Sequence, residues 1–277
     1  MQGPDDLIDL DRYPVDNLGK PETAALVAGL RRDLDETALA RLPGFLKPGA
    51  VAAMAAEAQE LVPTAHRRSQ LRTPYGWMDN SGFSEGHPRH ALFTRRAGII
   101  TRDMFPETSL VRSLYLWEPL TEFVRRVLGF EALFRSDDPW LSVVVDVEDE
   151  GGQFGWHFDT TDGVVSLLLQ EPDEGGGFEL VPYIRDEDDE NYEEVARVFA
   201  GKSTLVQKPA ITAGTFLLFR GRRSLHRVAP VGRTAKPRLI ALFSYDHRPG
   251  MVFPEATVSS ALGTTSEPHT GSPSLAR

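Results

Sequence analysis

The sequence predicts an α+β domain in which helices brace an antiparallel β-sandwich or barrel. Apolar residues recur at helical spacing mainly before Leu133. After Leu133, short β-branched or alternating segments follow one another, separated by glycine and proline turns. Helices followed by a series of short strands favour one domain in which the helices support a sheet. A chain of 277 residues fits such a unit.

The N-terminal half supplies the expected helices. One helix begins near Glu22 and gives way to an extended piece at 40–46, and "KPGAVAAMAAEAQELV" forms a second helix with Pro48 in its first turn. The segment "SLVRSLYLWEPLTEFVRRVLGF" returns to helical spacing and stops at Gly129. Residues 66–96 are irregular and rich in glycine, proline, arginine and aromatic side chains. A long loop of this kind is often functional, and we expect it to form a lid.

The strand-forming region extends from Leu133 to about residue 250, with the acidic helical insertion "DEDDENYEEVARVFAG" inside it. Three parts of the chain follow from this organisation. Residues 1–20 are polar and contain several prolines, which predicts a loosely ordered arm, and residues 21–257 form the single predicted domain. Residues 258–277 are small, polar and aperiodic, which predicts a disordered tail.

Composition narrows the classes of partner. The chain has no cysteine, so disulfides, thiolate metal sites and a cysteine nucleophile are excluded. A formal net charge of -10 argues against nucleic acid as the main partner and leaves a small-molecule substrate. No apolar run approaches the roughly 18 residues of a membrane span, and the acidic first residues do not resemble a secretory signal. These features are consistent with a cytoplasmic protein that does not bind membranes.

The segment "GWHFD" contains the first candidate metal ligands. His157 and Asp159 lie two residues apart, so on a strand they would share one face. The chain has seven histidines, and His226 stands out because it follows an apolar strand and precedes a proline turn. Two imidazoles and one carboxylate form the facial triad of non-haem Fe(II) oxygenases, which leaves coordination positions open. From these residues alone, a surface strand with no metal remains the alternative.

A co-substrate can be placed on the same reasoning. The open positions of such an iron site suit a bidentate 2-oxo acid and O₂, and the second carboxylate of the 2-oxo acid needs a buried cation. Arg238 begins the apolar strand that follows His226, and an arginine fork binds a carboxylate through two hydrogen bonds. We therefore expect Arg238 to bind the co-substrate.

Several longer segments together resemble the Fe(II)/2-oxoglutarate-dependent oxygenases. These are "GWHFD", "LLLQEPDEGGGFELVPYIR", "DENYEEVARVFAGK", "GTFLLFRGRRSLHRVAPV" and "LFSYDHRPG". More narrowly, they are similar to the group that contains the free-amino-acid radical halogenases, such as the lysine chlorinase, and their hydroxylase relatives. The resemblance implies a double-stranded β-helix, or jelly roll, braced by the N-terminal helices.

The resemblance also implies cofactors and site residues. It implies iron bound by His157, Asp159 and His226, and 2-oxoglutarate held by Arg238. Halogenases of this group have glycine or alanine at the carboxylate position, where chloride binds instead, so Asp159 implies hydroxylation. Many relatives have Arg-x-Ser at the 2-oxoglutarate site, but Ile240 stands in the serine position here. Ser244 or Tyr245 is expected to make that contact.

The residues around the motif give candidates for the substrate pocket. Arg72 could hold a substrate carboxylate, and Trp156, Thr160 and Asp162 flank the iron ligands. The expected activity is hydroxylation of an unactivated C–H bond of a free amino acid or small derivative, with release of succinate and CO₂. Two alternatives stay open: the same chemistry on a carrier-bound, peptide or natural-product substrate, and a non-catalytic jelly-roll binding domain.

Overall fold

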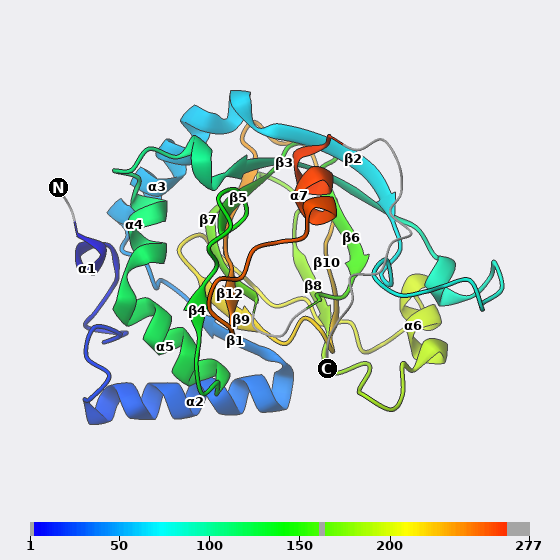
Figure 1. The fold of residues 1–277 in the computed structure, drawn as a ribbon, viewed down its shortest axis with the longest axis horizontal. Helices are drawn as coiled ribbons and strands as arrows, with labels where there is room; N and C mark the ends of the chain where they lie inside the picture. Colours follow the sequence, from blue (N-terminus) through cyan, green and yellow to red (C-terminus); the bar gives the residue numbers. More distant parts are fainter. Residues whose placement is uncertain (1–2, 161–163, 265–277) are drawn as a thin grey trace.

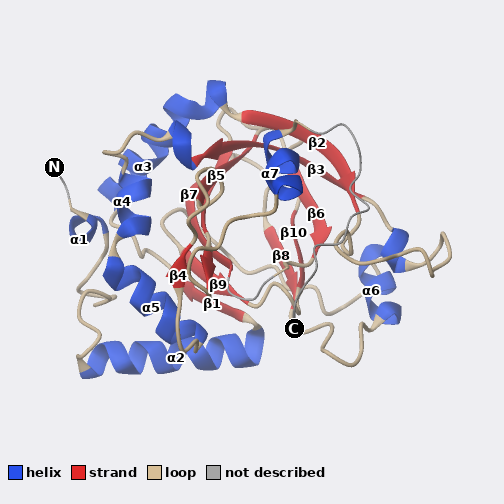
Figure 2. Ribbon diagram, in the orientation of Figure 1, coloured by secondary structure: helices blue, strands red, loops and turns tan. Residues whose placement is uncertain are grey.

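A curled antiparallel sheet of ten strands forms the body of the protein (Figures 1 and 2). The computed structural model describes residues 3–160 and 164–264. The strands follow the order β1-β9-β7-β11-β5-β3-β6-β10-β8, and β2 pairs with β3 off this path. Their bounds are β1 Leu39–Leu42, β2 His66–Arg72, β3 Phe93–Thr101, β5 Val143–Glu148, β6 Gln153–His157, β7 Val164–Gln170, β8 Phe178–Val181, β9 Phe216–Phe219, β10 Leu225–Val228 and β11 Arg238–Phe243. A separate small sheet pairs β4 (Phe134–Arg135) with β12 (Tyr245–Asp246).

Helices α2 to α5 gather along one side of the curled sheet, and α6 lies on the opposite side (Figure 2). The helices are α1 Pro4–Leu7, α2 Pro21–Thr37, α3 Pro48–Leu61, α4 Leu110–Leu116, α5 Glu118–Leu128, α6 Tyr192–Phe199 and α7 Glu255–Leu262. Three 3-10 turns, η1 Val62–Thr64, η2 Pro88–His90 and η3 Arg102–Met104, complete the helical elements of the described residues. No helix in these residues is both long enough and apolar enough to span a membrane.

Proline positions explain where two of these helices begin. Pro48 opens α3, as the sequence predicts. The helical segment before Gly129 divides into α4 and α5 at Trp117, whose backbone is extended. Pro119 accounts for the break, because within a continuous helix its ring would clash with the carbonyl group of Tyr115. Gly129 then ends α5 with a φ of 78°, a left-handed conformation that glycine adopts without strain.

The expectation of one irregular stretch over residues 66–96 is wrong at both ends. His66–Arg72 forms β2, and it pairs in unbroken register with Phe93–Thr101, which forms β3. Only the residues between these strands form a loop, interrupted by η2. The hairpin was missed because both faces of its strands carry arginine, so the apolar alternation that reveals a half-buried strand is absent.

The arm and the tail also differ from expectation. Leu7, Ile8, Tyr13 and Val15 are buried in the main core, and the Lys47 amide donates a hydrogen bond to the Leu7 carbonyl oxygen at 2.9 Å. Residues 1–20 are therefore packed on the domain over the part described. The predicted tail begins too early, because residues 258–262 belong to α7, whose apolar side packs on the sheet. Residues 265–277 lie outside the described residues, and the single-domain assignment stays a prediction.

The sheet has an outer face, covered by helices, and an inner face enclosed by its own curvature. Val143, Val145 and Val147 of β5 pack in the core shared with the helices. Since successive side chains of a strand point to opposite faces, Asp146 and Glu148 of the same strand lie on the inner face. Around α6, a second cluster that includes Trp156 and Leu225 covers the outer face of β6 and β10. The inner face carries the polar side chains and the candidate ligands, together with apolar side chains such as Phe178 and Phe219.

Phe216 of β9 provides a test of the main core. Its side chain is fully buried and its ring stacks on Phe45 with centroids 4.7 Å apart. Phe216→Ala should lower the free energy of unfolding by about 3–5 kcal/mol, because it removes the ring and leaves a cavity. Leu205→Ala, at a side chain that is 51% exposed, should change it by less than about 0.5 kcal/mol. Denaturant titration measures both, and equal effects would contradict this description of the core.

Candidate metal centre

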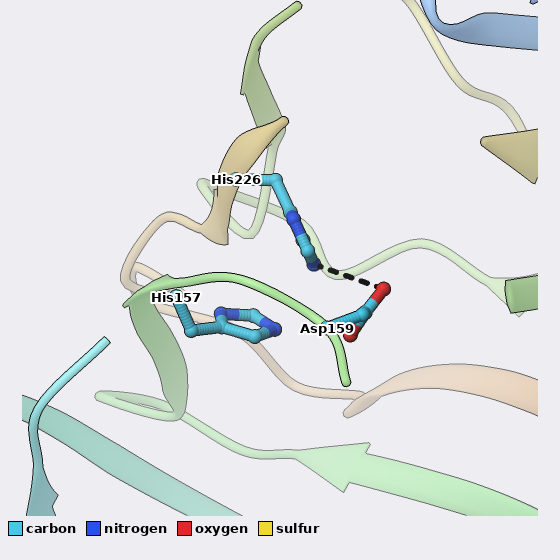
Figure 3. Close-up of side chains that lie close together, drawn as sticks. All are labelled: His157, Asp159 and His226. Atoms are coloured by element: carbon cyan, nitrogen blue, oxygen red, sulfur yellow. Dashed lines mark ion pairs between the residues drawn. The ribbon is translucent and has the colours of Figure 1, made fainter. Parts of the chain in front are cut away.

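Two paired strands bring the candidate ligands together. His157 ends β6 and His226 lies on β10, and the two residues face each other directly in the antiparallel register. Their rings are 4.1 Å apart between centroids. Asp159 lies just beyond the end of β6, and its Oδ2 atom is 3.7 Å from His226 Nε2 (Figure 3). One ligand atom from each of the three residues lies within 4.8 Å of the other two.

Backbone carbonyl groups hold both imidazoles in one tautomer. His157 Nδ1 lies 2.8 Å from the Gly155 oxygen, and His226 Nδ1 lies 2.9 Å from the Ser224 oxygen. A carbonyl oxygen only accepts, so each Nδ1 carries a proton and each Nε2 is the nitrogen left to bind a metal. Burial, followed by the nearby His226, holds the pKa of His157 well below its usual range, so this imidazole is neutral. Two imidazoles and a carboxylate fit a divalent transition metal such as iron.

Gly221 makes room for the Asp159 carboxylate. The Asp159 amide donates to the Gly221 carbonyl oxygen at 3.1 Å, so the two backbones are in contact. A Cβ atom at position 221 would lie 1.9 Å from Asp159 Oδ2, well inside the contact distance of the two atoms. Only glycine at this position therefore allows the carboxylate to lie where it meets the two histidines.

Aromatic rings surround the two imidazoles. Phe154 lies 4.7 Å from the His157 ring, while Phe219 and Phe178 lie 4.9 Å and 5.9 Å from the His226 ring. A register shift between β6 and β10 sets Phe154 and His157 on the same face although they are three residues apart. These rings pack against the two imidazoles and help to keep them in place.

Arg238 lies at the start of β11, where its partner is Glu148 of β5. The Arg238 Nη1 to Glu148 Oε2 distance is 2.9 Å, and both side chains are almost completely buried. Burial raises the pKa of Glu148, an effect that Arg238 opposes. A second inner-face pair joins Arg68 and Asp146 at 3.4 Å. The predicted co-substrate residue therefore lies inside the sheet, with one carboxylate already bound to it.

Sequence reasoning missed the polar residues of the inner face. Asp146 and Glu148 alternate with valines in "VVVDVE", and this pattern could have indicated two buried carboxylates on one face of a strand. Arg68 and Arg95 were taken as part of an irregular loop, so nothing connected them with the site. The sequence held a signal for the two carboxylates and for Arg238, but none for Arg68 or Arg95.

The residues expected to bind the substrate and the co-substrate do not lie close together. Trp156 is buried on the outer face of β6, opposite to His157, and packs with Tyr75 and Phe158. Arg72 ends β2, where its Nε donates to Gln70 Oε1 at 2.8 Å and a terminal nitrogen contacts the Ser260 hydroxyl of α7. Thr160 is exposed directly after Asp159. Asp162 lies outside the described residues.

Ser244 and Tyr245 are placed between the sheet and the helices. The Ser244 hydroxyl donates to the Leu141 carbonyl oxygen at 2.9 Å. Tyr245 packs against Tyr115 in the helix-covered core, with ring centroids 5.5 Å apart. The structure thus gives both residues local packing partners and does not bring Tyr245 to the inner face.

Comparisons with known proteins identify the family. A family model described as Halogenase D (HalD) matches residues 22–252, and the chain therefore belongs to this family. A search of curated proteins finds no match.

Solved structures of similar fold include enzymes that are named for different reactions. SnoN, an alpha ketoglutarate dependent epimerase from nogalamycin biosynthesis, has a TM-score of 0.55 at 17% identity and covers 91% of this chain and 97% of its own. The carbocyclase SnoK of the same biosynthesis has a TM-score of 0.54 at 18% identity, covering 95% and 96%. EctD from S. alaskensis has a TM-score of 0.51 at 18% identity, covering 79% and 75%. These likenesses confirm the expected double-stranded β-helix.

A substitution at Gly221 tests how Asp159 is positioned. Gly221→Ala should reduce Fe(II) affinity about 10- to 100-fold, the usual cost of disturbing a residue that orients a ligand. The new methyl group would displace the carboxylate while the two histidines stay in place. Competitive metal titration of the purified protein measures the change.

Gly177 is the matched control, because a Cβ atom there would meet no other atom within 4 Å and its φ is not positive. Gly177→Ala should bind Fe(II) like the wild type. Equal affinities for all three proteins would contradict the close contact between residues 221 and 159.

Proposed function

We propose that the protein is an Fe(II)- and 2-oxoglutarate-dependent oxygenase that hydroxylates a free amino acid or a small amino-acid derivative. The observation that carries the proposal is the convergence of His157, Asp159 and His226 on one point of the inner face. The relatives of like fold support the cofactors: SnoN has been solved with Fe3+ and alpha ketoglutarate, and EctD with 2-oxoglutarate and 5-hydroxyectoine. Succinate and CO₂ would be the by-products.

Each residue of the centre has a separate role in this proposal. His157 and His226 supply nitrogen ligands that their carbonyl partners keep aligned. Asp159 supplies one negative charge against the divalent iron. Iron, 2-oxoglutarate and O₂ supply the oxidising chemistry, while the chain determines which C–H bond lies within reach. Arg72, Thr160 and Asp162 remain candidate contacts for the substrate, whereas the outward position of Trp156 argues against a contact from its side chain.

Hydroxylation is favoured over halogenation by Asp159. Its carboxylate occupies the position that is glycine or alanine in the halogenases which the sequence resembles, so no ligand position is left for chloride. The family name, Halogenase D, makes chlorination the second candidate. The two reactions differ in product mass, and the presence of chloride in the assay distinguishes them. The wider alternatives are a carrier-bound, peptide or natural-product substrate, and a binding domain without catalysis.

The loop between β2 and β3 is the candidate lid. Arg89 anchors it to α6, because its Nε donates to the Tyr192 hydroxyl at 2.6 Å and its guanidinium lies over the rings of Phe83 and Tyr192. This anchor would hold the loop beside the apolar cluster around α6, and Arg72 would lie where the loop begins. We therefore place substrate entry near this loop.

A substrate screen is the direct test of the proposed function. Iron-loaded protein with 2-oxoglutarate should release succinate only with a particular free amino acid, whose mass should rise by one oxygen atom. Mass spectrometry of the product and a succinate assay provide the two measurements. Chloride should leave the product unchanged. A chlorinated product would favour the halogenase alternative, and succinate without any amino-acid product would direct the search to tethered substrates.

Replacement of Asp159 tests the ligand assignment. Asp159→Ala should abolish hydroxylation, because iron would lose its only carboxylate ligand from the chain and the geometry of the site. Asp188→Ala, on the exposed acidic segment before α6, should retain wild-type turnover. Normal hydroxylation by the Asp159→Ala protein would show that the assigned ligand is wrong.

A further inference from the structure

Arg95 lies on the inner face of the sheet, one aromatic ring away from a candidate metal ligand. It pairs in register with Phe154 of β6 and with Gln70 of β2. Its guanidinium carbon is 3.7 Å from the Phe154 ring centroid, and that ring is 4.7 Å from the ring of His157. The cation is therefore next to the metal centre.

Within the described part of the chain, Arg95 forms no hydrogen bond or ion pair through its side chain, and its Nε atom is buried without a partner. Two other arginines of the inner face are ion-paired, since Arg68 pairs with Asp146 and Arg238 pairs with Glu148. Burial, followed by the repulsion of Arg68, holds the pKa of Arg95 well below its usual range. The side chain as a whole is partly exposed, and the carboxylates of Asp146 and Asp159 act on its charge, but neither of them is hydrogen-bonded to the guanidinium. A guanidinium group in such a position can still accept a carboxylate partner.

The charged side chains around the metal centre could bind one further anion. Asp146 and Glu148 already have arginine partners, and Asp159 belongs to the metal centre. In the described residues, the side chain of Arg72 on the neighbouring strand hydrogen-bonds the neutral groups of Gln70 and Ser260 and no carboxylate. The inner face therefore has more positive than negative charge on the side of β2 and β3, which is the balance that a carboxylate ligand would complete.

We propose that Arg95 binds a carboxylate group of the small molecule that lies beside the metal centre. An arginine fork suits a carboxylate because it can donate two parallel hydrogen bonds. Two molecules could bring this group: 2-oxoglutarate, through the carboxylate remote from iron, or the amino-acid substrate. If the amino-acid substrate supplies the carboxylate, the inference rests on the proposed function. If 2-oxoglutarate supplies it, the inference rests only on the binding of this co-substrate.

The first arm of the test asks about 2-oxoglutarate. Its affinity for the Fe(II)-loaded protein, without O₂, is compared with that of 2-oxopentanoate, in which a methyl group replaces the remote carboxylate. If Arg95 binds this carboxylate, Arg95→Met should weaken 2-oxoglutarate binding about 10- to 100-fold and leave 2-oxopentanoate binding unchanged. Arg95→Lys should give an intermediate loss.

The second arm asks about the substrate. Free amino acids and their carboxamides are added to the Fe(II)–2-oxoglutarate protein without O₂, and the rise in melting temperature reports binding. If the substrate supplies the carboxylate, one amino acid should stabilise the wild type and not Arg95→Met, and its carboxamide should stabilise neither.

Arg96→Met is the matched control, because this neighbouring arginine is exposed on the opposite face of β3. It should behave as the wild type in both arms. Arg95→Met breaks no side-chain hydrogen bond or ion pair among the described residues, so the ligand-free variant should melt no lower than the wild type.

The proposal is overturned if Arg95→Met keeps the preference for 2-oxoglutarate and no amino acid depends on Arg95 for binding. Failure of every amino acid to stabilise the wild type would count against the proposed substrate class. The 2-oxoglutarate arm would still decide whether Arg95 holds the co-substrate.

Discussion

The antiparallel pairing of β6 with β10 is the contact on which the candidate centre depends. It sets His226 directly opposite His157, and each ring is then fixed by the backbone carbonyl group two residues earlier on its own chain segment. A register error of one residue would turn one imidazole to the outer face, where Trp156 and Leu225 pack. The apolar cluster on that outer face therefore keeps the two strands in register. A shift would place polar side chains in the cluster and expose apolar ones, which would cost hydrophobic free energy.

The inner face combines groups that rarely share one interior. Two carboxylates, two paired arginines and a third arginine lie within the same curled sheet as two histidines. Paired charges contribute little net stability when buried, since desolvation offsets much of their attraction. In this protein the pairs serve to fix positions, because Glu148 and Asp146 each hold one guanidinium group in place. Arg95 is then the cation that remains available to bind a ligand.

The sequence predicted the elements that follow a regular pattern. The helices near Glu22 and Pro48, the strands after Leu133 and the three metal-ligand candidates could all be placed from periodicity, turn residues and the resemblance. The hairpin of β2 and β3 could not, because arginines on both of its faces hide the alternation. The irregular register of β6 could not be predicted from the sequence either, and so the contact between Phe154 and His157 was also missed. Contacts of Arg238 with Glu148 and of Asp159 with Gly221 join residues far apart in sequence, and no local pattern encodes such distances.

The last helix has a consequence for any shortened or fused form of this protein. Helix α7 offers carbonyl groups to two side chains of β2: Ala261 accepts from Arg68 at 3.0 Å and Ser260 accepts from Gln70 at 3.2 Å. Its Ser260 hydroxyl also contacts Arg72. A recombinant boundary placed before Glu255 would therefore remove these hydrogen-bond acceptors from β2, the strand that pairs with β3. A C-terminal boundary should therefore lie beyond Leu262, where the helix ends.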